Sequence, residues 1–319
     1  MAVLGSVVGF SFGSTVAKGA HLPIPVLMWW RLSLATLIWH GWCARPSSTT
    51  RFHRFGHNAA QRRAFRLSIA AGVLFGVNLL LIFSGILRTR VANAEFIIQL
   101  SPLMIVPIAA RRLREQIDRS ILVFGALAVG GVATILLNSS SRGTHRWAGD
   151  LLVAAGISVG VIYTFVVREA RQNIETPQFM AIMSTAAALV VLPFAVATGS
   201  MFVVGWHGAL FILVLTMLSS VFGHGLQVWA QRSVPLSTIS LLGLSQPALA
   251  VTWAWIFLGE QVRPIQVLGM AFVLLAVGGI ALYSPAGAAM RSQFAYRRAA
   301  RRMPAGSMVD ASNEPVDAT

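Results

Sequence analysis

The sequence has almost no lysine and almost no cysteine. Lys18 is the only lysine, and Gly19 and Ala20 follow it, so the chain lacks the G-x-x-x-x-G-K-[S/T] loop that binds phosphates in ATP-driven proteins. Cys43 is the only cysteine, which excludes an intrachain disulfide and a Cys-x-x-Cys metal site. The strings H-E-x-x-H and G-x-S-x-G are also absent. We therefore expect no metal and no cofactor, and any energy for work must come from a gradient or a partner.

Charge is scarce as well, and most of it is positive. Only 11% of the 319 residues are charged and 56% are apolar, with a mean hydropathy of +0.71. Soluble proteins have about 25% charged and about 45–50% apolar residues. The 25 Lys and Arg residues outnumber the 10 Asp and Glu residues, and they lie in short clusters between long apolar runs. This arrangement indicates a protein embedded in a lipid bilayer, without a nucleic-acid partner.

Ten apolar runs are long enough to cross a bilayer as helices. A crossing needs about 20 apolar residues, because the hydrocarbon core is about 30 Å thick and a helix rises 1.5 Å per residue. The predicted spans are Ala2–Gly19, Pro25–Cys43, Leu67–Leu87, Val91–Ala110, Ser120–Leu137, Asp150–Val167, Pro177–Ala197, Gly208–Ala230, Leu236–Leu258 and Pro264–Tyr283. The first of them has no basic segment before it, and no small-residue cleavage site precedes Lys18. We therefore interpret it as a span and not as a signal peptide. The sequence predicts an all-α, multi-pass integral membrane protein.

The distribution of positive charge predicts the orientation of the spans. If the N-terminus is cytoplasmic, the cytoplasmic connections and the tail carry 18 Lys and Arg residues, and the outer connections carry six. Positive residues concentrate on the cytoplasmic side of membrane proteins. We therefore expect both termini in the cytoplasm and the chain in the cytoplasmic membrane.

Three sequence strings occur twice in the same order. Leu-Ser-Pro at 100–102 returns as Leu-Ser-Gln-Pro at 244–247, and each proline is followed thirteen residues later by Glu-Gln, beginning at Glu115 and Glu260. The segment Ala128–Ala133 likewise returns as Ala276–Ala281. Each half holds five predicted spans, and an odd number of spans gives the two halves opposite orientations in the membrane. Inverted repeats are typical of alternating-access transporters, which bind substrate between the repeats.

These strings resemble the EamA-type domain of the drug/metabolite transporter superfamily. The resemblance rests on Leu-Ser-Pro at 100–102 with Glu115, and on Gly13-Ser14 leading to Lys18 and then Arg31. It implies two EamA repeats, at 2–138 and 149–284, followed by a cytoplasmic, disordered tail at 285–319. It also implies a central cavity lined mainly by helices 1, 3, 4, 6, 8 and 9, with helices 5 and 10 at the periphery. Family members are mostly exporters of amino acids, metabolites or toxic compounds.

The sequence departs from the EamA pattern at two positions. Arg114 stands where a glycine is usual before Glu115, and Glu95 stands where a small residue is common. The first departure falls in a connection between spans. The second falls inside a span, where it bears on what the protein carries.

Arg31 and Glu95 are the only charged residues well inside a predicted span. A charge at the membrane centre costs about 2.5–3.5 kcal/mol, so such a residue is a candidate for function. They lie about 9 Å and about 6 Å from the outer ends of their spans and can therefore pair. The alternative is that both reach the outer interface, or that they form a structural latch. Gln99 lies one turn deeper on the face of Glu95 and continues a polar stripe.

Uncharged polar residues in other spans complete the set of substrate-binding or coupling candidates. An unpaired amide in hydrocarbon is costly, so each either lines a wet cavity or bonds a neighbouring helix. For the histidine and the tyrosine, the alternative to proton or ligand binding is a helix-to-helix hydrogen bond or simple packing. These candidates are Asn78, Ser245, Gln246, His224, Gln227 and Tyr163.

Glycines spaced four apart predict close contacts between helices. The Gly-Gly pairs at 130–131 and 278–279 also suit close packing of the fifth and tenth spans, or a homodimer contact. The spaced glycines are Gly5, Gly9, Gly13, Gly156 and Gly160.

The leading hypothesis is a secondary transporter, and not an enzyme, that exports a small metabolite, amino acid or drug-like compound by alternating access, with coupling to protons. One alternative is a non-transporting sensor or scaffold, which would carry an attached soluble domain; only the tail of about 35 residues is available for one. The other is a membrane-embedded, lipid-modifying enzyme. Such an enzyme needs clustered His, Asp or Glu residues, and the acidic residues here are scattered.

If Glu95 carries the coupling proton, Glu95→Gln should abolish the pH dependence of transport while the protein stays folded and inserted. The glutamine keeps the size and hydrogen bonding of the side chain but cannot exchange a proton. Transport by the variant across a pH series is the measurement, and an unchanged pH dependence would remove Glu95 from the coupling role.

Overall fold

The computed structural model describes residues 2–19, 22–45, 58–86, 88–89, 94, 97–115, 117–137, 147–258 and 263–283. Every element that it describes is a helix. Glu95 and Glu260 lie outside the described residues. The elements are α1 (Ala2–Gly19), α2 (Ile24–Ala44), α3 (Ala59–Ile86), α5 (Ser101–Arg112), α6 (Arg119–Leu137), α7 (Trp147–Ala170), α8 (Thr176–Ala197), α9 (Trp206–Leu215), the π-helix η2 (Thr216–His224), α10 (Gly225–Ala230), α11 (Leu236–Gly243), α12 (Gln246–Leu258) and α13 (Pro264–Tyr283).

Three of the predicted spans differ from uniform α-helices. In the span expected at Val91–Ala110, the described residues 97–99 are helical, Leu100 forms a turn, and the helix resumes as α5 at Ser101. The span expected at Gly208–Ala230 is one continuous helix over Trp206–Ala230 that contains the π segment η2. The span expected at Leu236–Leu258 is broken, since α11 ends at Gly243 and α12 begins at Gln246. Pro247 explains the break, because it has no N–H to donate to the carbonyl four residues earlier, at Gly243, and is tolerated in the first turn of a new helix.

By length and apolar composition, four continuous helices of the described chain are able to cross a membrane. These are Ala59–Ile86, Trp147–Ala170, Thr176–Ala197 and Trp206–Ala230. Shorter apolar helical stretches occur at Ala2–Ser11, Arg119–Thr134 and Pro264–Ile280.

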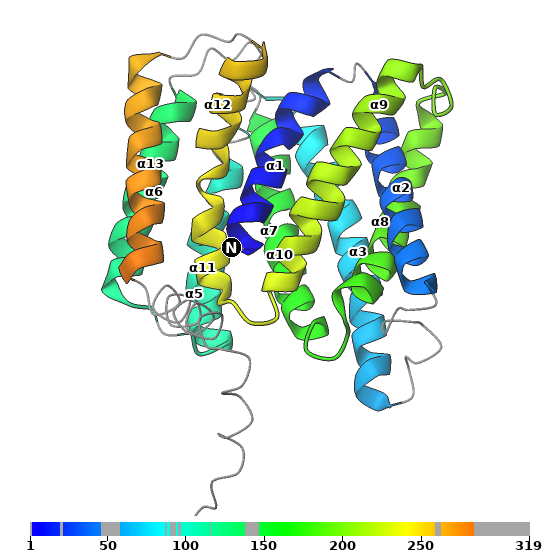
Figure 1. The fold of residues 1–319 in the computed structure, drawn as a ribbon, viewed down its shortest axis with the longest axis horizontal. Helices are drawn as coiled ribbons and strands as arrows, with labels where there is room; N and C mark the ends of the chain where they lie inside the picture. The colour runs from blue at the N-terminus through cyan, green and yellow to red at the C-terminus, as the bar shows by residue number, and fades with distance from the viewer. Residues whose placement is uncertain are drawn as a thin grey trace, which may run out of the picture.

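The helices stand side by side in one bundle (Figure 1). At one edge α6 packs along α13, and at the opposite edge α2 packs along α8. Between the edges, α3 packs against α7 and α8, and α1 packs against η2, α10 and α12. We call the end drawn at the bottom of Figure 1, where α2, α7, α10 and α13 end, the lower end.

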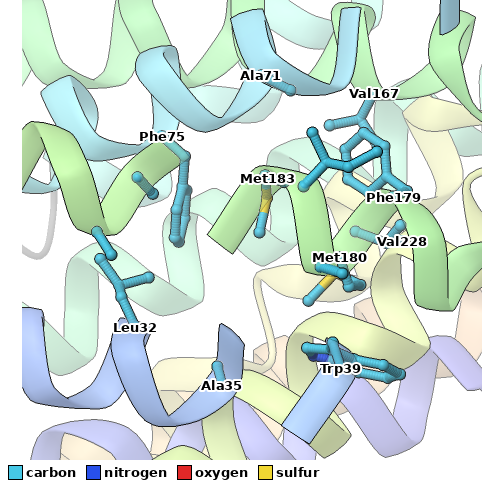
Figure 2. Close-up of a cluster of buried hydrophobic side chains, with 14 of the residues drawn as sticks. Leu32, Ala35, Trp39, Ala71, Phe75, Val167, Phe179, Met180, Met183 and Val228 are labelled. Atoms are coloured by element: carbon cyan, nitrogen blue, oxygen red, sulfur yellow. The ribbon is translucent and has the colours of Figure 1, made fainter. Parts of the chain in front are cut away.

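Apolar side chains fill the bundle in two clusters. The first lies between α2, α3 and α8, where Leu32, Phe75 and Met183 project into a shared space (Figure 2). The second joins α1, α5, α6, α7, α11, α12 and α13. Many large apolar side chains also point outward; Leu275 on α13, for example, is 65% exposed. Outward apolar faces of this extent suit contact with lipid, because exposure of large apolar surfaces to water is unfavourable.

Backbones approach closely where glycines face each other. A Cβ on Gly9 of α1 would lie 2.6 Å from the Leu218 carbonyl oxygen and 2.9 Å from the Gly223 Cα, both on η2. A Cβ on Gly72 of α3 would lie 2.4 Å from the Met183 carbonyl oxygen of α8. These atoms belong to the backbone and cannot rotate away. The two contacts therefore fix how near α1 lies to η2 and how near α3 lies to α8.

We expect Gly9→Ala to destabilise the protein by about 1–3 kcal/mol, because the added methyl group forces α1 away from η2. Thermal or denaturant unfolding of the purified protein in detergent measures the change. Gly41→Ala on α2 is the matched control, since no atom lies within 4 Å of the added Cβ. There the substitution should be neutral or stabilising by up to about 1 kcal/mol. Equal stability of the two variants would contradict the proposed contact.

Candidate functional site

The Arg31 guanidinium is buried inside the bundle, where it faces η2. Arg31 on α2 is 7% exposed, its Nε donates to the Ser220 hydroxyl at 2.8 Å, and its Nη1 lies 3.8 Å from the Met28 sulfur. Among the described residues no carboxylate forms an ion pair with it. A guanidinium has five N–H donors, so Arg31 retains donor capacity beyond these two contacts. Such a group is able to bind an anion.

A histidine and a tyrosine lie next to this arginine. The Tyr163 hydroxyl on α7 and Nε2 of His224 share a hydrogen bond of 2.6 Å, and the same hydroxyl lies 3.4 Å from the Met183 sulfur. His224 and Ser220 are both on η2 and stand about one turn apart. The imidazole and the Arg31 guanidinium are therefore held by neighbouring positions of one helix. The sequence predicted Arg31, Tyr163 and His224 separately, and the structure brings them together.

Aromatic rings surround this polar group. The Phe75 ring on α3 lies 4.8 Å from the His224 ring and 5.3 Å from the Tyr163 ring, measured between centroids. The Phe10 ring on α1 meets the His224 ring edge-on at 5.8 Å. Small-molecule sites combine apolar and aromatic walls with a few convergent polar groups, which is the composition found here. We call Arg31, Ser220, Tyr163, His224 and Phe75 the central cluster.

The segment η2 gives the central cluster an irregular backbone. Its nine residues, Thr216–His224, form a π-helix. Such segments are rare in proteins, but where they occur they are often at functional sites. Ser220 and His224 lie in this segment, which packs against the Gly9 backbone. Ser220 was not predicted as a site residue, because a serine within a span gives no signal of its own.

Other predicted residues have structural roles or lie apart from the central cluster. The Asn78 amide on α3 donates to the Gly156 carbonyl on α7 at 2.7 Å, so it bonds a neighbouring helix, as the alternative interpretation predicted. The Ser245 hydroxyl donates to the Leu242 carbonyl at 2.6 Å, at the break between α11 and α12. Among the described residues, the central cluster has no hydrogen bond from any of the three glutamines predicted as candidates, Gln99, Gln227 and Gln246.

A small cavity of about 40 Å³ lies near the start of α2, and of the two residues that contact Arg31 only Met28 lines it. It lies between α2, α3 and α8, and its lining includes Met28, Leu79 and Phe83. Ligand pockets usually measure about 300–1,000 Å³, so this cavity is too small to hold a metabolite. A much larger groove of about 830 Å³ runs along α3, α7 and α8 on the outer surface. Within the described ranges, no group of three or more His, Cys, Asp or Glu residues is placed to hold a metal ion.

A second polar group lies at the lower end. The Glu115 carboxylate accepts hydrogen bonds from the backbone N–H of Leu236 at 2.8 Å, and from the backbone N–H and the hydroxyl of Ser237 at 3.1 and 2.7 Å. It therefore caps α11, where the helix dipole favours negative charge. The sequence repeat contained Glu115 but did not reveal what it binds. Nearby, the Arg168 guanidinium donates to the carbonyls of Gln231 and Val234.

Arg171 follows α7 at the same end and is almost fully buried. It donates to the carbonyls of Val228 and Ile174. Burial lowers its pKa to about 10, so it remains charged at neutral pH. The buried charge is compensated by these carbonyl oxygens and by the nearby Glu175, which counteracts part of that lowering.

The backbone before Glu115 explains why the EamA pattern usually has a glycine at position 114. Arg114 has a φ of 53°, which lies in the left-handed region that favours glycine. This residue follows the end of α5 and reverses the chain, as C-terminal helix caps commonly do. A glycine is therefore usual at this position because it adopts this conformation without strain. The turn directs Glu115 toward α11.

We expect Arg114→Gly to be neutral or to stabilise the protein by up to about 1 kcal/mol, because relief of the left-handed strain offsets or exceeds the cost of the unfolded-state entropy that glycine adds. Arg112→Gly is the matched control: Arg112 is the last residue of α5, and glycine there should destabilise by about 0.5–1 kcal/mol. Thermal unfolding of both variants is the measurement. A loss of stability in Arg114→Gly as large as in Arg112→Gly would contradict this explanation.

Comparison with known proteins identifies relatives that are transporters. Over 106 residues the chain is 31% identical to the threonine/homoserine exporter RhtA of Escherichia coli strain K12, which covers 33% of this chain and 36% of RhtA. It is 26% identical over 205 residues to the uncharacterized transporter YetK of Bacillus subtilis strain 168, covering 61% of this chain and 60% of YetK. The match thus spans little more than a third of the length of the exporter.

The chain also matches a solved structure in its fold and a known family in its sequence. A solved crystal structure superimposes with a TM-score of 0.73 at 14% identity, covering 87% of this chain and 96% of the other, so the two share a fold. The sequence model of the EamA-like transporter family matches residues 1–137 and 147–282. Since these two matches include most of the chain, the protein belongs to the EamA-like transporter family, whose members are integral membrane proteins.

Proposed function

We propose that this protein is a secondary transporter that exports a small metabolite, amino acid or drug-like compound by alternating access. The observation that supports it is the central cluster, which is buried and which both matched segments supply. Arg31 and Phe75 come from the first segment, and Tyr163, Ser220 and His224 come from the second. In secondary transporters built from repeats, the substrate site lies at the interface of the repeats. Neither an enzymatic function nor a non-transporting scaffold requires a buried polar cluster between the two matched segments.

The two segments are proposed to be inverted repeats, each of five membrane spans. The helix pairing supports this symmetry. If α1, α2, α3, α5 and α6 correspond to α7, α8, the α9–α10 helix, α11–α12 and α13, then exchange of the halves maps each major contact onto another contact. The contact of α3 with α7 becomes that of η2 with α1, and the pairs α2–α8, α5–α11 and α6–α13 map onto themselves. The domains would be 2–138 and 149–284, with a cytoplasmic tail at 285–319.

The protein is proposed to reside in the cytoplasmic membrane with both termini inside, so that the lower end faces the cytoplasm. The ratio of 18 to six Lys and Arg residues supports this orientation. A homodimer remains a proposal that rests on Gly130 and Gly278, where an added Cβ would meet no atom within 4 Å. Their neighbours, Gly131 and Gly279, pack α6 against α13 within the chain. Coupling to protons through Glu95 is likewise a proposal.

Flux measurements in proteoliposomes test the transport function. The vesicles receive pools of amino acids, small metabolites and cationic drugs, with and without a proton gradient, and empty vesicles give the background. We expect flux above the background for at least one class of compound, and stimulation by the gradient if transport is coupled to protons. No flux for any pool, with protein shown to be folded, would overturn the transport function and favour a sensor or scaffold.

Tyr163→Phe should lower this flux by about three- to tenfold, because it removes the hydroxyl that bonds His224 and a typical hydrogen bond contributes about 0.5–1.5 kcal/mol. Tyr296→Phe is the matched control, since Tyr296 follows both matched segments. It should transport as the unaltered protein does. Equal flux in the two variants would remove Tyr163 from the transport site.

A further inference from the structure

The donors of Arg31 are only partly used by the protein. Its Nε is bonded to Ser220, and its Nη1 contacts the Met28 sulfur at a distance of 3.8 Å. A thioether is a weak acceptor. No hydrogen bond from Nη2 to a described residue is present. The side chain is nevertheless buried, with 7% of its surface exposed. A buried cation in this state needs an anion or water to complete its bonding.

We propose that Arg31 binds the carboxylate of the transported compound, so that the substrates are small monocarboxylates such as amino acids and hydroxy acids. This inference rests on the transport function proposed above and names the substrate class of the same site. The planar guanidinium presents parallel N–H groups that match the two oxygens of a carboxylate. The bond from Nε to Ser220 fixes the plane of the guanidinium, and the weak contact with Met28 is the one that a carboxylate displaces.

The surroundings of Arg31 restrict the rest of the substrate. Within the described part of the central cluster and the side chains packed on it, Arg31 is the only formally charged group, so a second carboxylate would be buried without a partner. The Phe75 and Phe10 rings close to His224 present apolar surface for a short carbon chain, and ring faces also attract an ammonium group. The site therefore suits a compound with one carboxylate, a small apolar part and, in amino acids, an ammonium group.

The test compares acids with derivatives that lack only the carboxylate. L-Threonine is paired with L-threoninamide, L-homoserine with L-homoserinamide, and L-leucine with L-leucinamide, and the uptake of each is measured in proteoliposomes. We expect the unaltered protein to transport at least one acid ten or more times faster than its partner without the carboxylate. Arg31→Gln should bring this ratio close to one, since the glutamine cannot form an ion pair.

Two further variants separate binding from folding. Arg31→Lys keeps the charge but loses the planar pair of donors, and should lower transport of the acid by tenfold or more while the protein unfolds near its usual temperature. Arg63→Lys is the matched control, because Arg63 is an exposed residue that pairs with Glu169 at the lower end. It should leave the ratio unchanged. If Arg31→Gln does not fold, the ratios of the unaltered protein and of Arg31→Lys still decide.

The outcomes distinguish this inference from the transport function. Equal transport of acids and amides by the unaltered protein, or transport only of compounds without a carboxylate, would overturn the role of Arg31 and leave the transport function intact. A full acid preference in Arg31→Gln or in Arg31→Lys would also overturn it. Absence of flux for every compound would overturn the transport function itself, and the inference with it.

Discussion

The structure depends on one buried positive charge. Arg31 lies among apolar helices, where a cation without hydrogen bonds is costly. The protein meets part of this cost with a serine hydroxyl from a helix 189 positions later in the chain. That bond requires α2 to lie against η2, which in turn places His224 beside Tyr163 of α7. The polar centre of the bundle is therefore built outward from this arginine, and it joins both matched segments.

Close backbone contact makes this centre compact. Gly9 and Gly223 face each other with no side chain between them, so α1 lies near η2. Gly72 gives α3 the same freedom against α8. In a bilayer the hydrophobic effect does not drive helices together, and tight van der Waals packing between small residues takes its place. The same packing leaves little free space between α2, α3 and α8, where Met28 lines a cavity of about 40 Å³.

Much of the helical layout could be predicted from the sequence, because apolar runs and prolines are local features. The helices Ala2–Gly19 and Pro264–Tyr283 have the bounds that the apolar runs predict. Arg31 could be selected because a charge inside a span is conspicuous. The π segment could not be predicted, since its wider turns lie within one continuous apolar run and do not interrupt it.

Contacts between distant residues were also beyond reach of the sequence. Tyr163 and His224 are 61 positions apart, and nothing local indicates that they bond. Asn78 and Ser220 illustrate the same difficulty in opposite directions. The sequence left the asparagine either as a ligand of the substrate or as a bond to a neighbouring helix, and it bonds a backbone carbonyl; the serine gave no signal and holds the buried guanidinium. Which face of a helix meets which neighbour decides such roles, and hydropathy does not contain that information.

The cap that Glu115 places on α11 has a consequence for how the chain can be divided. The carboxylate belongs to the first matched segment, and the helix end that it neutralises belongs to the second. A first segment produced alone would keep a carboxylate with no helix to cap, and a second segment alone would expose the N–H groups of its own α11. Either piece would have to satisfy these groups with water or by meeting its complement. The two halves are thus mutually dependent at this bond, and the protein is a single unit of assembly although its sequence is doubled.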